Sequence, residues 1–421
     1  MQKEKNIYFP SIDNIKVAAD TIKNVSAVTP LSPSLRYSNC FKANILLKRE
    51  DLQQVRSYKI RGAYNKISSL TQEESQNGVV CASAGNHAQG VALSCKLLKI
   101  KGTIFMPAPT PNQKVEQVKM FGGDYVTIIL EGDTFDDAYH LAIKECKQLQ
   151  KVFIHPFNDE KVIEGQATVG LEIIEQSKRP IDYVFIPVGG GGLAAGLSTV
   201  FKTLSPNTKI IGVEPEGAAS MSISIKNKKN TTLDKIEKFI DGAAVKRVGD
   251  LTFDICKEHL DAMITVPEGK VCQTILDLYN KDAIVVEPAG ALSISALDLY
   301  GEEIKGKNVV CVVSGSNNDI TRTSEIKERA LLYANLKHYF IIKFPQRAGA
   351  LKEFVVDILG ENDDITYFQY AKKTNRENGS AVVGVQLKSS SDLEPLISKM
   401  KQHNFYGDYL NDKPDLFQFL V

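Results

Sequence analysis

The feature that most limits what this chain can fold into is a regular alternation of short apolar runs with longer amphipathic segments. The apolar runs lie at residues 78–82, 103–106, 125–129, 152–154, 183–188, 210–213, 263–266 and 308–313. Between most of them lie amphipathic segments at residues 88–98, 136–147, 162–176, 192–204 and 271–278. Near-continuous apolar strands separated by helices are typical of parallel sheets that helices cover on both faces. Because one small sheet needs fewer strands, the sequence predicts an α/β fold with two lobes and a cleft between them.

The pattern changes near Leu336, where the order of predicted elements becomes β-α-β-β-α-β. We expect strands and helices there, in chain order, at residues 339–344, 349–359, 365–372, 381–387, 392–403 and 416–421. This order is that of a ferredoxin-like unit, for which about 85 residues suffice as a separate domain. The sequence therefore predicts one large domain over residues 1–335 and a ferredoxin-like domain over residues 336–421.

Composition and charge exclude several classes of partner. The formal net charge of +1 gives no overall attraction to nucleic acid or to an anionic membrane. No apolar run approaches the length of a membrane span, and the polar N-terminus lacks the apolar core of a signal peptide. The seven cysteines are scattered without a Cys-x-x-Cys pair, which favours a reducing compartment. We expect a cytoplasmic protein without nucleic-acid or membrane partners.

A lysine stands between a predicted strand and a predicted helix in the stretch Ser57-Tyr58-Lys59-Ile60-Arg61-Gly62-Ala63. The positive end of a helix dipole disfavours a second positive charge, so the pKa of the Lys59 amine is expected to be lowered. A neutral lysine amine attacks carbonyl groups and forms a Schiff base. Since the chain has 51 Lys and Arg residues, Lys59 is a candidate only in combination with other motifs.

A run of four glycines, Gly189 to Gly192, follows the apolar run at residues 183–188 and opens a predicted helix. Glycines expose backbone N–H groups without side chains in the way, and the helix N-terminus adds positive potential. This combination predicts a phosphate cradle rather than a merely flexible turn. The motif is neither G-x-G-x-x-G nor a Walker sequence, so NAD and ATP are poor candidates.

Two further motifs follow apolar runs at the same kind of junction. In Ser83-Ala84-Gly85-Asn86-His87, Ser83 and the first helical N–H groups can bind a carboxylate, and Asn86 can donate to an aromatic oxygen. We expect His87 to be structural, because no Asp or Glu stands beside it.

A further motif, Ser314-Gly315-Ser316-Asn317, follows the run at 308–313. Ligands of open α/β sheets gather at the carboxyl ends of the strands. A Schiff-base lysine, a phosphate cradle and polar donors at such ends together predict pyridoxal phosphate.

Four motifs taken in order resemble those of the fold-type-II pyridoxal-phosphate enzymes. They are Ser-Tyr-Lys-Ile-Arg-Gly-Ala from Ser57, Ser-Ala-Gly-Asn-His-Ala-Gln-Gly from Ser83, Gly-Gly-Gly-Gly-Leu from Gly189 and Val-Glu-Pro-Ala-Gly-Ala from Val286. Within that group the chain is most similar to the biosynthetic threonine dehydratase family, over essentially its whole length. Its last domain, with Phe344-Pro345-Gln346-Arg347-Ala348-Gly349, resembles the single ACT-like regulatory domain of that family.

The resemblance implies a fold and a set of residue roles. The catalytic domain would resemble the tryptophan synthase β-subunit, with a smaller lobe of roughly residues 55–160 inserted in the larger lobe. Lys59 would hold the cofactor covalently, Asn86 would bond its 3-hydroxyl oxygen, and Ser314 would face its ring nitrogen. Gly189, Gly190, Gly191 and Gly192 would bind its phosphate. The substrate carboxylate would be held by Ser83 and the neighbouring backbone of Ala84, Gly85, Asn86 and His87.

The implied reaction is the deamination of L-threonine to 2-oxobutanoate and ammonia, the first committed step of isoleucine biosynthesis, with L-serine as a second candidate substrate. Lys59 would be the base. A hydroxyl such as Ser314 cannot fully protonate the ring nitrogen, so the cofactor is a weaker electron sink, which suits elimination better than transamination. The ACT-like domain implies feedback by isoleucine, opposed by valine. The alternative for residues 336–421 is a subunit interface alone, and a homodimer or homotetramer is expected in either case.

Two competing functions remain open at this stage. Serine racemase is a close relative, but its second proton donor is a serine directly before the Gly-Asn-His triplet, where this chain has Ala84. Its divalent-metal carboxylates are matched here only by Glu214, so we assign no metal site. A non-catalytic amino-acid sensor would have a broken cofactor site, whereas Lys59, Asn86, the glycines and Ser314 are all present. Ser316 stands where many relatives have glycine or alanine, which leaves its contact open.

Overall fold

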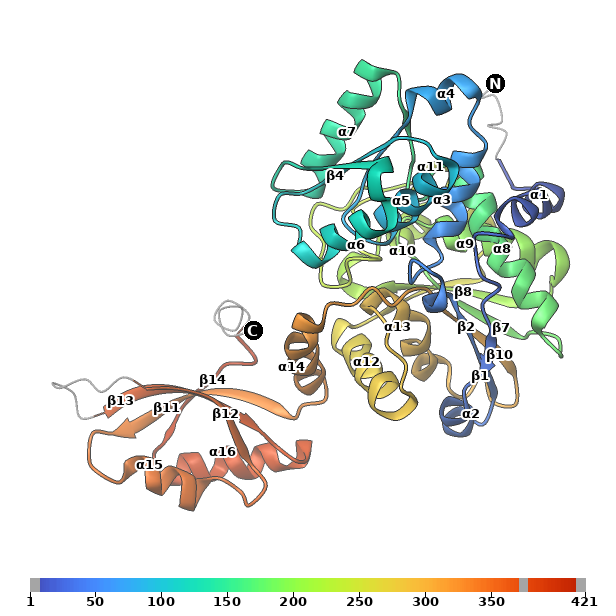
Figure 1. Ribbon diagram of the computed structural model, residues 1–421. Helices are drawn as coiled ribbons and strands as arrows, with labels where there is room; N and C mark the ends of the chain where they lie inside the picture. The colour runs from blue at the N-terminus through green and yellow to red at the C-terminus, as the bar shows by residue number, and fades with distance from the viewer. Residues whose placement is uncertain (1–7, 371–377, 414–421) are drawn as a thin grey trace. The chain divides into compact units, whose positions relative to one another are not determined.

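The computed structural model describes residues 8–370 and 378–413 of the chain. The chain divides into two compact units, residues 1–319 and residues 320–421, which Figure 1 draws in order from blue to red. The first unit contains two mainly parallel sheets with helices around them, and the second contains one antiparallel sheet with its helices. Within the described ranges, no helix is both long enough and apolar enough to cross a membrane.

The larger sheet of the first unit has six strands. Their order is β1 (Leu31–Pro33), β2 (Asn44–Arg49), β10 (Asn308–Val313), β7 (Tyr183–Pro187), β8 (Lys209–Pro215) and β9 (Ala262–Val266). All neighbours pair in parallel except the edge strand β1, which runs antiparallel to β2. Every residue of β10 is buried, as expected for a central parallel strand that is covered on both faces.

Helices cover both faces of this larger sheet. Val310 and Val312 of β10 pack into the same core as residues of α8, α9 and α11, whereas α13 packs on the other side. The helices of this lobe are α1 (Ile12–Ile22), α2 (Leu35–Phe41), α8 (Glu160–Gln176), α9 (Gly192–Leu204), α10 (Ser220–Lys226), α11 (Asp250–His259), α12 (Glu268–Asp282) and α13 (Pro288–Ser295). Each buried valine of β10 contributes about 1.5–3 kcal/mol through the hydrophobic effect.

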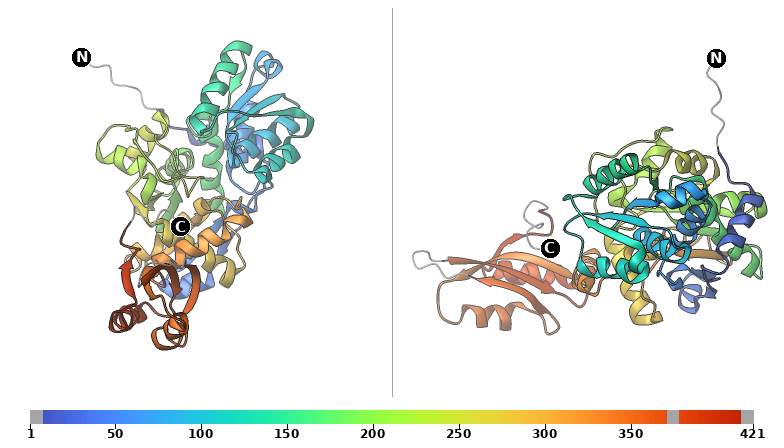
Figure 2. Two further views of the ribbon diagram at one scale, coloured as in Figure 1. Left: turned by 90° about the vertical axis from the view of Figure 1, so that its left-hand side faces the viewer. Right: turned by 45° about the horizontal axis from the view of Figure 1, so that its top comes forward.

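The smaller sheet has four parallel strands in the order β5 (Val126–Leu130), β4 (Gly102–Met106), β3 (Val79–Ala82) and β6 (Val152–Phe153). Its helices are α3 (Lys59–Ser68), α4 (Gln72–Asn77), α5 (Asn86–Leu98), α6 (Asn112–Gly122) and α7 (Phe135–Leu149). Alternate residues of β3 face opposite sides: Val79 and Cys81 share a core with α5, and Val80 and Ala82 share one with α7. The two further views in Figure 2 show α7 on one side of this sheet and α5 with α6 on the other.

This smaller lobe is inserted in the larger one, because the chain leaves the large sheet after β2 and returns to it at β7. Parallel strands present their carboxyl ends at one edge of each sheet. The motifs at Ser83, Gly189 and Ser314 follow the carboxyl ends of β3, β7 and β10, respectively. Lys59 is the first residue of α3, close in sequence to the end of β2. The topology therefore directs all four motifs toward one region between the lobes.

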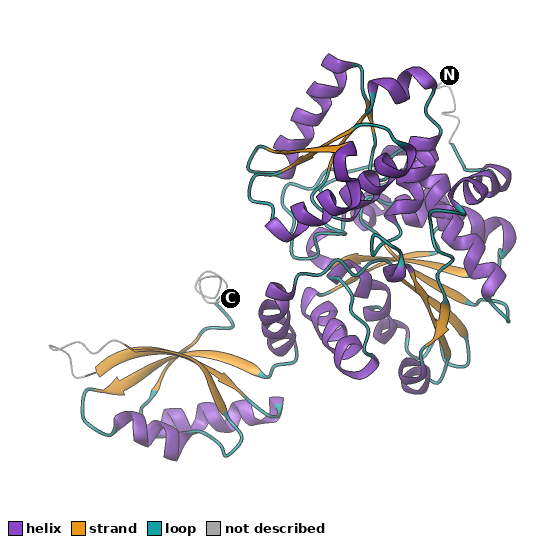
Figure 3. Ribbon diagram, viewed as in Figure 1, coloured by secondary structure: helices purple, strands orange, loops and turns teal. Residues whose placement is uncertain are grey.

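The second unit begins with the short 3-10 helix η5 (Ile320–Arg322), which α14 (Thr323–Tyr333) follows. It contains an antiparallel sheet in the order β12 (Asp364–Tyr370), β13 (Asn378–Gln386), β11 (Lys337–Pro345) and β14 (Tyr406–Tyr409). Two helical segments cover one face of this sheet (Figure 3): α15 (Ala350–Glu353), which continues as the π-helix η6 (Phe354–Ile358), and α16 (Leu393–Gln402). The predicted β-α-β-β-α-β order is thus present. The last strand among the described residues is β14, and the strand predicted at residues 416–421 lies outside them.

Candidate active site

The amine of Lys59 lies at the N-terminal end of α3, partly buried, and its Nζ donates a hydrogen bond of 2.8 Å to the carbonyl oxygen of Pro156. Burial lowers the pKa of this amine to about 8, and the nearby carboxyl group of Glu287 opposes the shift. The predicted direction of the shift is therefore right, but burial is its main cause rather than the helix end. About a tenth of the Lys59 amine is consequently neutral, and thus nucleophilic, at pH 7, against less than about a thousandth at an ordinary lysine pKa of ~10.4.

The backbone around Lys59 is held by close packing. A Cβ atom on Gly90 of α5 would lie 3.1 Å from the carbonyl carbon and oxygen of Lys59, so only glycine allows α5 to approach this closely. On the other side, the N–H of Tyr58 donates to the carbonyl oxygen of Ser314 at 3.3 Å, and Ser57 forms an isolated bridge with Gly315. Lys59 is thereby fixed between the smaller sheet's α5 and the end of β10.

The glycine run connects β7 to α9 and has little free space beside it. Gly191 has a φ of +92°, which a residue with a side chain rarely adopts. A Cβ on Gly190 would lie 2.1 Å from the ring of Phe157, and one on Gly192 would lie 3.0 Å from the Cβ of the same residue. The carbonyl of Gly190 accepts a 2.6 Å hydrogen bond from the hydroxyl of Thr252 on α11. The first-turn N–H groups of α9 have no partner within the helix, so this loop offers them to an anion.

One loop, residues 154–158, joins the lysine to the glycines. Its Pro156 accepts from Lys59, its Phe157 packs on Gly190 and Gly192, and its Ile154 carbonyl oxygen lies 2.8 Å from Nε2 of His87. The loop is closed by His155, whose Nδ1 accepts from the backbone N–H groups of Phe157 and Asn158 at 3.2 and 2.8 Å. Burial is the main cause that lowers the pKa of His155 to about 4, so His155 is neutral.

Asn86, the first residue of α5, is held by two side chains that come from the larger lobe. Its Nδ2 donates to Oε1 of Glu287 at 2.6 Å, and its Oδ1 accepts a hydrogen bond from Nδ2 of Asn317. Glu287 is buried at the N-terminus of α13, where burial and the nearby charge of Asp241 raise its pKa to about 7. The amide of Asn86 therefore has a fixed orientation between the lobes.

The other residues of the Ser83 motif follow β3. The hydroxyl of Ser83 accepts from the backbone N–H of Gly85 at 3.3 Å, and Ala84 and Gly85 are partly buried at the turn into α5. His87 is buried against Ile154, and burial lowers its pKa to about 3. His87 is therefore neutral in the folded protein, which agrees with a structural role and not with that of an acid at neutral pH.

Ser314 is buried at the end of β10, and its backbone contacts Tyr58 next to Lys59. Ser316 points elsewhere: its hydroxyl donates to the carbonyl oxygen of Asp51 at 3.1 Å, and its N–H donates to the carbonyl oxygen of Arg56. These bonds give Ser316 a structural contact with the segment that precedes Lys59.

Among the residues that the structure describes, no group of three or more His, Cys, Asp and Glu side chains is arranged to hold a metal ion. Glu214, the carboxylate singled out from the sequence, accepts hydrogen bonds from the backbone N–H groups of Met221 and Ser222 at 2.7 and 2.8 Å, and from the Ser222 hydroxyl. Its oxygens therefore cap the N-terminus of α10.

The structure thus brings the four predicted motifs into one region and adds residues that the sequence reasoning did not assign. These additions are Glu287, Asn317, Pro156, His155 and Phe157. A signal for Glu287 was present, because an acidic residue stands directly before the proline that begins α13, inside a quoted motif. The loop at residues 154–158 carries no comparable pattern.

Comparison with known proteins gives this site a family. The family described as "Pyridoxal-phosphate dependent enzyme" matches residues 22–315, and the family described as "C-terminal regulatory domain of Threonine dehydratase" matches residues 328–420. The biosynthetic L-threonine dehydratase IlvA of Halalkalibacterium halodurans is 54% identical over 410 residues, which cover 97% of this chain and 99% of that protein. The chain belongs to the pyridoxal-phosphate-dependent threonine dehydratase family.

Solved structures with the same fold include other members of this enzyme group. The processed form of threonine deaminase isoform 2 from Solanum lycopersicum is 40% identical, has a TM-score of 0.72, and covers 77% of this chain and 97% of its own. Maize serine racemase is 31% identical with a TM-score of 0.71, covering 77% of this chain and 99% of its own. The fold-type-II architecture predicted for the threonine dehydratase family is thereby confirmed, and the same fold carries racemases as well.

Proposed function

We propose that this chain deaminates L-threonine to 2-oxobutanoate and ammonia with pyridoxal phosphate as cofactor, as the first committed step of isoleucine biosynthesis. The observation that carries the proposal is the amine of Lys59, which has a lowered pKa and lies within the same constellation as a backbone phosphate cradle. Membership of the threonine dehydratase family supports the reaction and the substrate.

The residues present fit pyridoxal phosphate. The positive φ of Gly191 and the start of α9 give an N–H-lined loop suited to a phosphate dianion. Lys59 would hold the cofactor covalently, the oriented amide of Asn86 would meet its ring oxygen, and Ser314 would meet its ring nitrogen. When bound, the cofactor supplies an electron sink for the charge that develops at Cα of the substrate.

The protein's own groups then have separate tasks. Ser83 and the backbone from Ala84 to His87 hold the substrate carboxylate at the N-terminal end of α5, where the helix dipole favours an anion. Lys59 Nζ takes the proton from Cα, and the carbonyl of Pro156 holds its amine by a hydrogen bond. The proton that Lys59 takes from Cα passes to the β-hydroxyl, which leaves as water, and the enamine product takes up water to give 2-oxobutanoate and ammonia. Neutral His87 and His155 bring no competing positive charge at neutral pH.

Racemisation of serine is the second candidate, since maize serine racemase shares the fold. It requires a proton donor on the face of the substrate opposite Lys59. Ala84 occupies the position at which the racemases carry that donor, and its methyl group has no proton to give. Elimination needs a base on only one face, so the residues present favour the dehydratase.

We further propose that residues 1–335 form the catalytic domain and residues 336–421 the regulatory domain, with isoleucine as inhibitor and valine opposing it. The effector changes activity only if it binds two states of the protein unequally. A homodimer or homotetramer is expected, since the antiparallel sheet has β12 and β14 at its edges within the part of the chain that the structure describes. All seven cysteines are free thiols, which supports a cytoplasmic location.

The test measures 2-oxoacid release from L-threonine and from L-serine, each with and without isoleucine. We expect faster release from threonine, inhibition by isoleucine, and no activity in Lys59→Ala. The absorbance band of the lysine-bound cofactor should also be lost in Lys59→Ala. Lys119→Ala is the control, because Lys119 is exposed on α6 and pairs with Glu116 of the same helix. Absence of the band in the wild-type protein supplied with cofactor would refute the enzyme assignment in favour of a sensor. Equal rates on both substrates without inhibition would indicate an unregulated catabolic dehydratase.

A further inference from the structure

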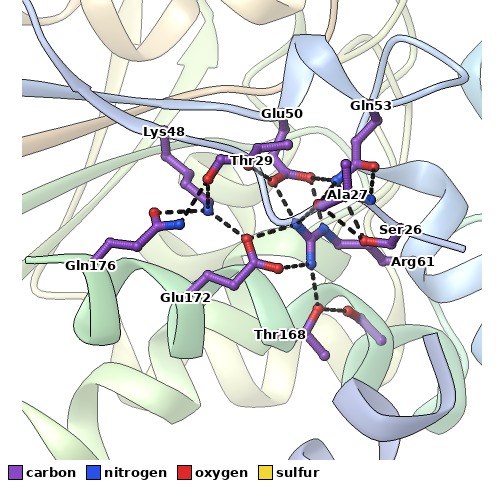
Figure 4. A network of polar contacts seen from close by, with 11 residues as sticks. Ser26, Ala27, Thr29, Lys48, Glu50, Gln53, Arg61, Thr168, Glu172 and Gln176 are labelled. Atoms are coloured by element: carbon purple, nitrogen blue, oxygen red, sulfur yellow. Dashed lines mark hydrogen bonds and ion pairs between the residues drawn. The ribbon is translucent and has the colours of Figure 1, made fainter. Parts of the chain in front are cut away.

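Arg61, two residues after Lys59 on α3, is completely buried, and its guanidinium group meets two carboxylates. It donates to both oxygens of Glu50 at 2.8 Å, and to both oxygens of Glu172 at 2.6 and 2.9 Å. Two further donations go to the hydroxyl of Thr168 at 3.0 Å and to the carbonyl of Ala27 at 3.3 Å. Figure 4 shows the guanidinium group between these partners, which come from three separate segments: the loop at Ala27, the turn at Glu50, and α8.

The charges of this cluster balance. Lys48 of β2, also buried, donates to Glu172 at 2.5 Å and to the carbonyl of Thr29 at 2.7 Å. The two cations, Lys48 and Arg61, are thus matched by the two anions, Glu50 and Glu172. The carboxylates of Glu50 and Glu172 raise the pKa of Arg61 against the effect of burial, and Arg61 in turn lowers the pKa of Glu50. Arg61 and Glu50 are therefore charged, whereas burial lowers the pKa of Lys48 against the opposing effect of Glu172 and Glu50. A buried charge whose partner is missing is strongly unfavourable.

The cluster is attached to the same helical turn that carries Lys59. The N–H of Arg61 donates to the carbonyl of Tyr58 at 3.0 Å, so Lys59 lies inside the turn that this bond closes. Gly165 of α8 packs against the carbonyl of Arg61, where an added Cβ would be 2.7 Å away. Gly90 packs against the carbonyl of Lys59 from α5. The first turn of α3 is consequently held by packing against α5 and α8 and by directional bonds at both ends. The N–H of Tyr58 bonds to Ser314 before Lys59, and the side chain of Arg61 bonds to Glu50 and Glu172 after it.

We propose that Arg61 is a positioning residue: its paired bonds to Glu50 and Glu172 fix the first turn of α3, and thereby the location of the Lys59 amine. Arg61 itself touches none of the residues proposed to hold the cofactor. Its planar fork of donors meets two carboxylates at once, a geometry that the single ammonium group of a lysine cannot reproduce. The inference rests on the proposed role of Lys59.

The experiment measures the apparent pKa of Lys59 in the full-length protein without cofactor. Trace acetic anhydride labels the amine at a series of values between about pH 6 and pH 11, and the labelled peptide is quantified by mass spectrometry. The titratable groups that face Lys59 are Glu287, His87, His155 and Tyr58, whose ring centre lies 5.2 Å from the amine, and they are unchanged in every variant used. In the wild type we expect an apparent pKa near the value of about 8 that burial produces.

In Arg61→Lys we expect the apparent pKa of Lys59 to rise by about one unit or more, toward ~10.4 for a solvated lysine, because the amine leaves its partly buried place. The matched control is Ile67→Ala, a buried residue in the last turn of α3, which lowers the melting temperature without moving the first turn. If Arg61→Lys does not fold, Glu172→Gln removes one carboxylate charge at the same size, and a smaller rise is expected.

The proposal would be overturned if the apparent pKa of Lys59 stayed at the wild-type value in a folded Arg61 or Glu172 variant with a lower melting temperature. The cluster would then have a purely stabilising role. The same rise in Ile67→Ala would overturn it as well. The labelling needs neither cofactor nor substrate, so a failed deamination assay with an intact pKa shift would count against the proposed function alone.

Discussion

The replacement of Gly190 by alanine tests whether the phosphate cradle depends on the loop at residues 154–158. The new Cβ would lie 2.1 Å from Cδ1 of Phe157 and 2.3 Å from two further ring atoms. Carbon atoms in contact are about 3.5 Å apart, so the ring must move by about 1.4 Å. That movement pulls on the neighbouring carbonyl of Pro156, which accepts the hydrogen bond of Lys59.

Overpacking of this kind costs about 1–3 kcal/mol. If the whole cost falls on the cofactor-bound state, the Kd for pyridoxal phosphate rises roughly 5- to 150-fold. Titration of the protein with cofactor, followed by absorbance, measures this change. Gly301→Ala is the control, because its nearest neighbours would lie at 3.7–3.9 Å, an ordinary contact distance.

Phe157→Ala in the same chain identifies the cause of the loss. If the clash with the ring is responsible, the double variant Gly190→Ala/Phe157→Ala binds the cofactor more tightly than the two single losses predict when added. Unchanged affinity in Gly190→Ala would refute the reasoning. The reasoning would also be refuted if the losses of binding free energy in the two single variants simply added in the double variant. The added methyl group would then act on the phosphate directly, without involving the Phe157 ring.

Three further predictions follow from individual contacts. Glu287→Ala leaves the amide of Asn86 without its acceptor and should lower kcat/KM for threonine roughly 10- to 100-fold. Glu287→Gln keeps an acceptor, so its kcat/KM should stay within about 5-fold of the wild-type value. Release of 2-oxoacid measures both. His155→Asn keeps an acceptor for two backbone N–H groups but cannot be protonated. The pKa of His155 is about 4 in the folded state, below its ordinary value of about 6.5, so the folded state is less stable once the unfolded state takes up a proton there. The free energy of unfolding of the wild type should therefore fall by roughly 2–3 kcal/mol, relative to that of the variant, as the pH is lowered from about 6.5 to 4. Urea unfolding at a series of pH values measures this loss. The Lys114–Asp241 ion pair is partly exposed, so Lys114→Met should change the unfolding free energy by less than about 1 kcal/mol, and a larger loss would contradict its exposed setting.

Much of the α/β fold is predictable from the sequence, for a physical reason. Parallel strands that are buried on both faces need near-continuous apolar residues, and the runs at 308–313 and 183–188 match β10 and β7 to within one residue. The long helices carry clear one-sided patterns, and the segment at 192–204 matches α9. The motifs converge because the carboxyl ends of parallel strands lie at a common edge.

The elements that the sequence did not predict are those stabilised by their neighbours. The three-residue β1 pairs with β2 and lies outside every predicted strand and helix. Strand β14 contains glycine and aspartate and has no apolar run, yet it pairs with β11. The helix expected over residues 349–359 changes at Phe354 to the wider π-helix. No local periodicity in the sequence predicts these two strands or the π-helix.

The site divides in the same way. Lys59, Asn86, the glycines and Ser314 follow predicted strands, so their meeting could be anticipated. The hydrogen bond between Asn86 and Glu287 joins residues 201 positions apart, and the loop that carries Pro156 has no marker of its own. Such contacts depend on how the two lobes face each other, which local sequence patterns do not record.

The cradle formed by Gly189 to Gly192 has a consequence for the conditions in which the protein can work. Its positive potential comes from peptide groups and a helix end, which do not ionise, whereas a cradle of histidines would lose its charge near neutrality. The positive potential that this loop offers to an anion is therefore independent of pH in the physiological range. The same loop tolerates few substitutions. A side chain at Gly190 would meet the ring of Phe157, and one at Gly191 would meet Met221 and Thr252 and would have to adopt a positive φ.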